Sequence, residues 1–74
     1  MRSGLSPHDR SLVSVASLAA LYRTNELPFH INRALDNGVT QDEIIELITH
    51  LAFYSGWPTA FTAAPIAQRV FDQR

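Results

Sequence analysis

The stretch from Thr40 to Pro58 constrains the fold more than any other part of this chain. Thr40 is followed three residues later by Glu43, the spacing of a capping box in which each side chain binds the other residue's backbone N–H. Apolar residues then recur at helical spacing: Ile44, Leu47, Ile48, Leu51 and either Ala52 or Tyr54. Gly56 favours a left-handed stop, and Pro58 can begin a helix but cannot continue one. The pattern predicts a helix that ends at an abrupt corner.

A first helix is predicted to begin after Ser6, which is a good cap, with Pro7 at its first position. Apolar residues fall on nearly every face of this helix as far as Leu21, which predicts burial on most sides and, in so short a chain, a partner subunit. Residues 1–5 are predicted to be disordered or added for expression. Residues 6–74 are predicted to form one helical domain, which would also fit a fragment of a longer chain.

Two more helices are predicted on either side of the Thr40 helix. Asn25 is a good cap for the second, and Asn37-Gly38 ends it. A fourth runs to about Phe71, and Pro65 within it should kink the helix or free one carbonyl. The expected buried stripes are Leu27, Ile31, Ala34 and Leu35 in the second helix, and Ala60, Ala63, Ala64, Ala67 and Val70 in the fourth. The predicted fold is all-α, with four helices in two antiparallel hairpins.

The composition narrows the functional classes. A chain of 74 residues buries too little surface for more than marginal stability alone, and without cysteine it has no disulfide or thiolate chemistry, so self-association is the expected aid. All six basic residues are arginine, which excludes a lysine Schiff base. A net charge of −1 without a basic run argues against a nucleic-acid partner, and no apolar run is long enough for a membrane span. We expect a cytoplasmic protein.

Three segments, LSPHDRSLVSVASLAAL, LPFHINRALDNGVTQDEI and ITHLAFYSGWPTAFTA, resemble the carboxymuconolactone decarboxylase family. The most specific motifs are the H-x3-AL-x2-G run that starts at His30 and the HLAFYSGWP run that starts at His50. The resemblance implies an all-helical, alkylhydroperoxidase D-like fold that assembles as a dimer, trimer or hexamer. It also implies a carboxy-lyase of aromatic catabolism that decarboxylates a small carboxylated lactone without a cofactor.

Alkylhydroperoxidases of the same superfamily carry a C-x-x-C pair, with a histidine four residues after the second cysteine. Counted back from His30, those cysteine positions hold Arg23 and Glu26 here. Without thiols there is no disulfide exchange, so an antioxidant peroxidase is the least favoured function. A non-catalytic oligomerisation or ligand-binding module is the alternative from another class.

A decarboxylase must bind the substrate carboxylate with a cation and return a proton to the carbon that loses CO2. Glu26, His30 and Arg33 share one face of the second helix at i, i+4 and i+7 spacing. The hypothesis is that His30 is the general acid, Glu26 orients it, and Arg23 or Arg33 holds the carboxylate. The alternative is a solvated helix face with a routine ion pair.

The aromatic residues near Gly56 have two interpretations. Tyr54, Trp57 and Phe61 are either core side chains at a helix corner or an apolar wall of the substrate pocket, with the Trp57 N–H or the Tyr54 OH as a hydrogen-bond donor. His50 follows Glu46 by one turn and is either a buried or interface histidine hydrogen-bonded to that carboxylate or a second polar group in the pocket. No histidine spacing indicates a metal site.

Overall fold

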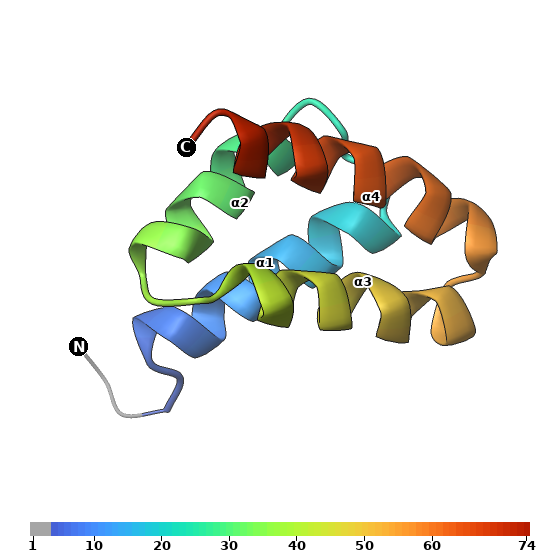
Figure 1. Ribbon diagram of the computed structural model, residues 1–74. Coiled ribbons are helices and arrows are strands. Elements are labelled where there is room, and N and C mark those ends of the chain that lie inside the picture. Colours follow the sequence, from blue (N-terminus) through green and yellow to red (C-terminus); the bar gives the residue numbers. More distant parts are fainter. Residues whose placement is uncertain (1–3) are drawn as a thin grey trace.

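The computed structural model describes residues 4–74 as four helices: α1 (Pro7–Ala20), α2 (Leu27–Asp36), α3 (Gln41–Tyr54) and α4 (Trp57–Asp72). Consecutive helices run in opposite directions (Figure 1), and α1 packs mainly on α2 while α3 packs mainly on α4. The prediction of an all-α fold built from two antiparallel hairpins is therefore confirmed. Residues 1–3, which belong to the segment predicted to be disordered, lie outside the described residues.

The helix starts follow the predicted caps at two of the three positions where a cap residue was named. The Ser6 hydroxyl accepts the Asp9 N–H at 3.1 Å, and the Thr40–Glu43 capping box is complete, with bonds of 3.0 and 2.9 Å. The prediction of Asn25 as a cap was wrong. The residue before α2 is Glu26, whose side chain makes no capping bond, because the turn that leads into α2 already supplies a carbonyl for the Leu27 N–H.

The corner between α3 and α4 is built on Gly56, whose φ of 97° and ψ of 153° suit glycine almost alone. This glycine lies directly before α4, and Ser55 closes α3. Helix α4 then continues through Pro65 without a break (Figure 1). Proline has no N–H to give to the carbonyl of Phe61, so of the two predicted effects of Pro65 the one that remains is a freed carbonyl.

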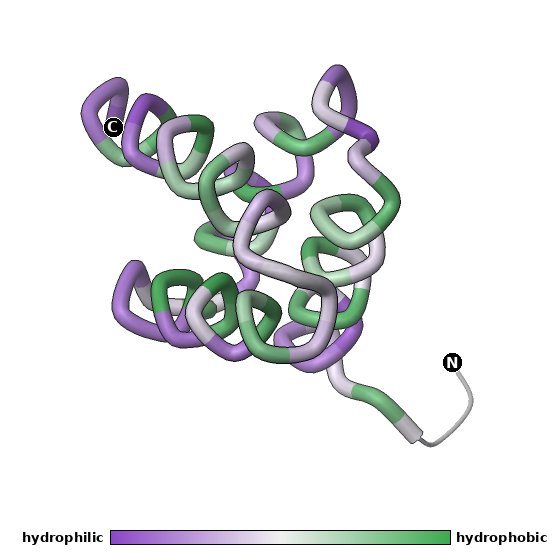
Figure 2. The backbone as a smooth tube through the Cα atoms, turned by 90° about the vertical axis from the view of Figure 1, so that its right-hand side faces the viewer, coloured by the Kyte–Doolittle hydropathy of each residue, from purple (hydrophilic) through white to green (hydrophobic). Residues whose placement is uncertain are grey.

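The core is made by one stripe from each helix. Each helix alternates hydrophobic and hydrophilic residues within its turns (Figure 2), which is the mark of amphipathic packing. The buried apolar residues are Val15, Ala19, Leu27, Ile31, Ala34, Val39, Ile44, Ile48, Ala52, Ala60, Ala63, Ala67 and Val70. One expectation needs correction, since Ala64 is exposed and the buried hydroxyl residue Thr59 extends the α4 stripe instead. Of the two alternatives for α3, Ala52 is buried and Tyr54 is exposed.

Helix α1 is less enclosed than its sequence predicts. Its fully buried residues form a single stripe of Ser11, Val15 and Ala19, while Val13 on another face is 53% exposed. Burial on most sides is therefore not reached within one copy of the chain. No helix among residues 4–74 combines the length and the apolar character that crossing a bilayer requires.

Candidate active site

Before the start of α2, Glu26, which the sequence hypothesis assigns to orient His30, forms an ion pair with Arg23. One guanidinium nitrogen of Arg23 lies 2.8 Å from the Glu26 Oε2, and both side chains are about half exposed. The hydrogen bond from Arg23 is the main reason that the pKa of Glu26 is lowered, and a smaller contribution comes from the charge of His30. Glu26 is therefore a carboxylate at neutral pH, with Arg23 as its direct partner.

His30 lies on α2, one turn after Glu26, the residue that precedes this helix, and it is half-buried. Its closest aromatic contact is Phe29, whose ring meets the imidazole edge-on, with 5.1 Å between ring centroids and 87° between planes. The guanidinium carbon of Arg33 lies 5.9 Å from the centre of the same Phe29 ring, which is a cation–π distance. Phe29 therefore links the predicted proton donor to a predicted cation, although the sequence hypothesis did not include it.

Arg33 differs from Arg23 in how its charge is used. Arg23 is neutralised by Glu26, whereas within residues 4–74 no ion pair involves Arg33. Both guanidinium groups are exposed. Of the two arginines suggested by the sequence, Arg33 is therefore the one whose hydrogen-bond donors are available to an added carboxylate.

Tyr54 and Trp57 belong to an aromatic surface at the α3–α4 corner rather than to the core. Trp57 lies between Phe53 and Phe61, with ring centroids 5.4 and 6.3 Å apart, and Tyr54 lies 4.5 Å from the His50 ring. The exposed fractions of Phe53, Trp57 and Phe61 are 71%, 53% and 72%. We call these three residues the aromatic row. The interpretation of Tyr54 and Trp57 as core side chains is wrong for the single chain.

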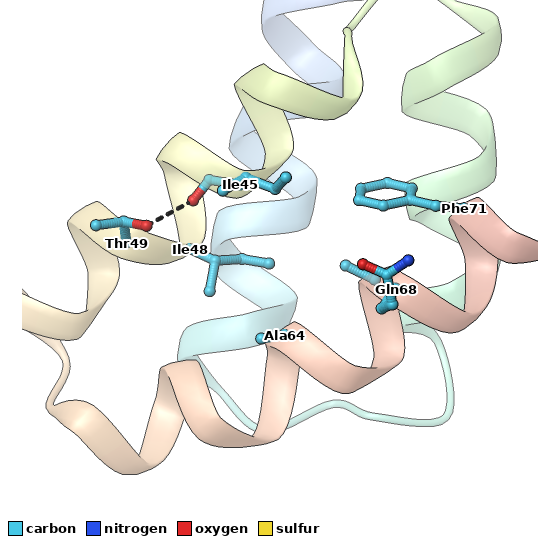
Figure 3. Close-up of a pocket in the computed structure, with 7 residues that line it drawn as sticks. Ile45, Ile48, Thr49, Ala64, Gln68 and Phe71 are labelled. Carbon is cyan, nitrogen blue, oxygen red and sulfur yellow. Dashed lines mark hydrogen bonds between the residues drawn. The ribbon is translucent and has the colours of Figure 1, made fainter.

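Two surface clefts lie elsewhere. A cleft of about 390 Å³ between α1 and α3 is lined by Leu12, Glu43, Glu46, Leu47 and His50. His50 is thus exposed on a cleft wall, and the predicted hydrogen bond to Glu46 is not found among the described residues. A smaller cleft of about 150 Å³ between α3 and α4 has Phe71 and Gln68 facing Ile45 and Ile48 (Figure 3). None of the six predicted site residues lines either cleft.

The α2 face carries the elements of carboxylate chemistry but is open to solvent in one copy. It combines an imidazole, an unpaired guanidinium and an aromatic ring on consecutive turns of a single helix. A metal site is not indicated, since within residues 4–74 no group of three or more His, Cys, Asp or Glu side chains is placed to hold an ion. The fold defines an all-helical protein whose α2 face carries hydrogen-bond donors of the kind that bind carboxylates.

Comparison with known proteins identifies the family. Residues 1–69 match the carboxymuconolactone decarboxylase family, and the chain belongs to it. A 4-carboxymuconolactone decarboxylase from Acinetobacter baylyi is 47% identical over 70 residues, which cover 95% of this chain and 52% of that protein. The nitrosuccinic acid decarboxylase npaB from Metarhizium robertsii is 34% identical over 71 residues, which cover 96% and 50%. The chain thus spans about half the length of these two relatives.

Proposed function

We propose that the protein is a decarboxylase that removes CO2 from a small carboxylated substrate without a cofactor, and that the α2 face is its active site. The proposal is supported by family membership and by two relatives that are both named as decarboxylases. The observation that carries it is the His30–Phe29–Arg33 cluster, which sets a proton donor and an available cation against one ring. A carboxylated lactone is the substrate class we favour, and aromatic catabolism in the cytoplasm is the proposed setting.

In this proposal Arg33 binds a substrate carboxylate. A guanidinium matches a carboxylate with two parallel hydrogen bonds, and this fixes the orientation of the group as well as its position. Arg23 remains bonded to Glu26 and takes the secondary role of keeping that carboxylate in place. Glu26 lies one turn before His30, the residue that gives the proton.

Loss of CO2 leaves the electron pair of the broken C–C bond on the substrate. In a conjugated lactone that pair moves into the carbonyl and forms an enolate, which Arg33 stabilises electrostatically. His30 then gives its proton to the carbon that lost CO2, and the imidazole regains a proton from water. All atoms balance without an oxidant or reductant, so the chemistry needs no thiol.

The two arginines allow a matched test of carboxylate binding. CO2 release is measured with a panel of carboxylated lactones and small dicarboxylic acids for the natural protein and for Arg33→Gln and Arg23→Gln. Because a hydrogen bond to a charged group contributes about 1.5–3 kcal/mol, Arg33→Gln should raise KM by roughly tenfold to a hundredfold. Arg23→Gln should change KM much less. A larger effect at Arg23, or no CO2 from any compound, would contradict the proposal.

We also propose that the active form is a homo-oligomer, in which a second copy covers the aromatic row and closes the pocket, with Tyr54 and Trp57 on its wall. The exposure of three neighbouring large aromatic side chains supports this, because soluble monomers seldom leave such a patch uncovered. Sedimentation of the native protein and of Trp57→Ser should show association that weakens in the variant. Association without CO2 release from any substrate would favour the alternative, a non-catalytic oligomerisation module.

A further inference from the structure

Among residues 4–74, Tyr22 is the only non-glycine residue with a positive φ, at 59°. It follows Leu21, the residue that caps the C-terminal end of α1, and its N–H donates to the Ala19 carbonyl at 3.2 Å. The next N–H, of Arg23, donates to the Leu18 carbonyl at 2.8 Å. These two bonds form a Schellman motif, and Tyr22 occupies the left-handed position that glycine usually fills.

Helix α2 ends in the same motif, but there glycine, the usual residue, occupies the left-handed position. There Gly38 has a φ of 96°, its N–H donates to the Leu35 carbonyl at 3.2 Å, and the Val39 N–H donates to the Ala34 carbonyl at 3.0 Å. A side chain in the left-handed conformation costs free energy that glycine avoids. Strain of this kind persists only where other contacts hold the residue. A contact of the Tyr22 side chain must therefore stabilise the left-handed conformation.

The hydroxyl of Tyr22 supplies that contact. It lies 3.2 Å from the Oγ1 of Thr59, a residue that is only 1% exposed although its side chain is polar. The same Oγ1 lies 3.1 Å from the Ser55 carbonyl oxygen. Because Thr59 has one hydroxyl proton, it can donate to Ser55 while accepting from Tyr22, and the three groups then form one hydrogen-bonded chain.

These hydrogen bonds, made by two hydroxyls and one backbone carbonyl, join the α1–α2 corner to the α3–α4 corner. Tyr22 belongs to the α1–α2 corner and is followed by Arg23, whereas Ser55 stands between Tyr54 and Gly56 at the α3–α4 corner. Tyr22 and Thr59 are 37 positions apart in the sequence. The α1–α2 corner, which carries the Arg23–Glu26 pair, is thereby anchored to the helix that also carries Trp57.

We propose that Tyr22 is a positioning residue that holds the Arg23–Glu26 pair in place, one turn before His30. Its hydroxyl keeps the corner in the left-handed turn, the turn fixes the backbone of Arg23, and the guanidinium then reaches Glu26 at 2.8 Å. Release of the corner would free Arg23 to compete with Arg33 for a substrate carboxylate. The consequence for catalysis rests on the function proposed above, but the positioning itself does not.

The positioning is tested without substrate by NMR titration of the Glu26 carboxyl group in native protein, Tyr22→Phe and Thr59→Val. The pKa of Glu26 is held low mainly by Arg23, so loss of the anchor should move it upward, towards its ordinary value, in both variants. Thr49→Val is the matched control. The Thr49 hydroxyl, like that of Thr59, donates to the carbonyl four residues before it, at 2.9 Å. Among residues 4–74, no hydrogen bond joins Thr49 to Tyr22. An unchanged pKa of Glu26 in Thr59→Val and in folded Tyr22→Phe would overturn the proposal.

Turnover provides the second readout. Tyr22→Phe should lower kcat/KM by roughly tenfold, because misplacement of groups near the reacting centre costs about this much or more. Thr49→Val should retain native turnover. If the native protein releases no CO2 from any carboxylated substrate, the proposed function fails, and the Glu26 titration still decides the role of Tyr22. If Tyr22→Phe does not fold, Thr59→Val gives the same decision.

Discussion

The imidazole Nε2 of His8 lies 3.0 Å from the Oε1 of Glu43, which joins the first turn of α1 to the first turn of α3. The other ring nitrogen lies 2.9 Å from the Oδ1 of Asp9. A neutral imidazole can donate from only one nitrogen, so two carboxylate partners favour the protonated ring. These hydrogen bonds, which the imidazole donates, raise the pKa of His8, the one to Asp9 more than the one to Glu43. The same Glu43 oxygen accepts the Thr40 N–H, so the capping box and the ion pair share one atom.

The stability of the fold should therefore depend on pH through His8. A raised pKa stabilises the fold fully below the unfolded value of about 6.5, and the effect is lost as pH rises through the folded value. The pKa of Glu43 is lowered, first by the Thr40 backbone hydrogen bond and then by His8, so its contribution is lost as pH falls below about 4.3. We expect His8→Gln to lower the urea midpoint at pH 5.5 and to have little effect at pH 9.

Glu43→Gln is the control for this prediction, because glutamine keeps the carbonyl acceptor of the capping box and loses only the charge. Combined with His8→Gln, it should cost less at pH 5.5 than the sum of the two single changes, since both remove the same ion pair. Equal losses for His8→Gln at both pH values, or full additivity of the two changes, would show that the ion pair does not stabilise the fold.

Neighbouring isoleucines on α3 predict opposite sensitivities in unfolding experiments. Ile44 is 0% exposed in the centre of the core, and Ile45, the next residue, is 50% exposed. Ile44→Ala should cost about 2–5 kcal/mol of unfolding free energy, because a cavity remains where the side chain was removed. Ile45→Ala should cost well under about 1 kcal/mol, as is usual at the surface. Similar costs at both positions would mean that Ile45 is covered in solution.

Gly56 tests the corner between α3 and α4. Its backbone angles fall in a region that is nearly restricted to glycine, although an added Cβ would meet only Pro58 Cδ at an ordinary 3.6 Å. Gly56→Ala should therefore destabilise the fold through backbone strain, by about 1–3 kcal/mol, rather than through a clash. Thermal unfolding measures this cost. A Gly56→Ala protein as stable as the native one would show that the corner can adopt another backbone conformation.

Local sequence signals predicted most of the fold. The Thr40–Glu43 box, the Ser6 cap and the Gly38 stop each depend on residues within a few positions of one another, so a short segment of sequence is enough to predict them. Asn25 failed as a cap because α2 begins only at Leu27, after Glu26. The next residue, Pro28, has no N–H to offer, and the Leu27 N–H donates to the Arg23 carbonyl instead.

The cross-helix contacts could not be predicted in the same way. His8 with Glu43 and Tyr22 with Thr59 are separated by 35 and 37 residues, and each depends on how two helices are rotated against one another. Phe29 could have been recognised, since it stands next to His30 and four residues before Arg33, the spacing that places side chains together on a helix. That His30 and Arg33 belong to an active site stays a prediction.

The central claim is that His30 donates the proton that completes decarboxylation. The most direct test is the rate of CO2 release by His30→Ala, compared with the native protein on the substrate that the native protein turns over fastest. Loss of a general acid should lower kcat by roughly a hundredfold to ten-thousandfold, with the helical circular dichroism and the oligomeric state unchanged. A folded His30→Ala protein that keeps nearly native turnover would contradict the claim.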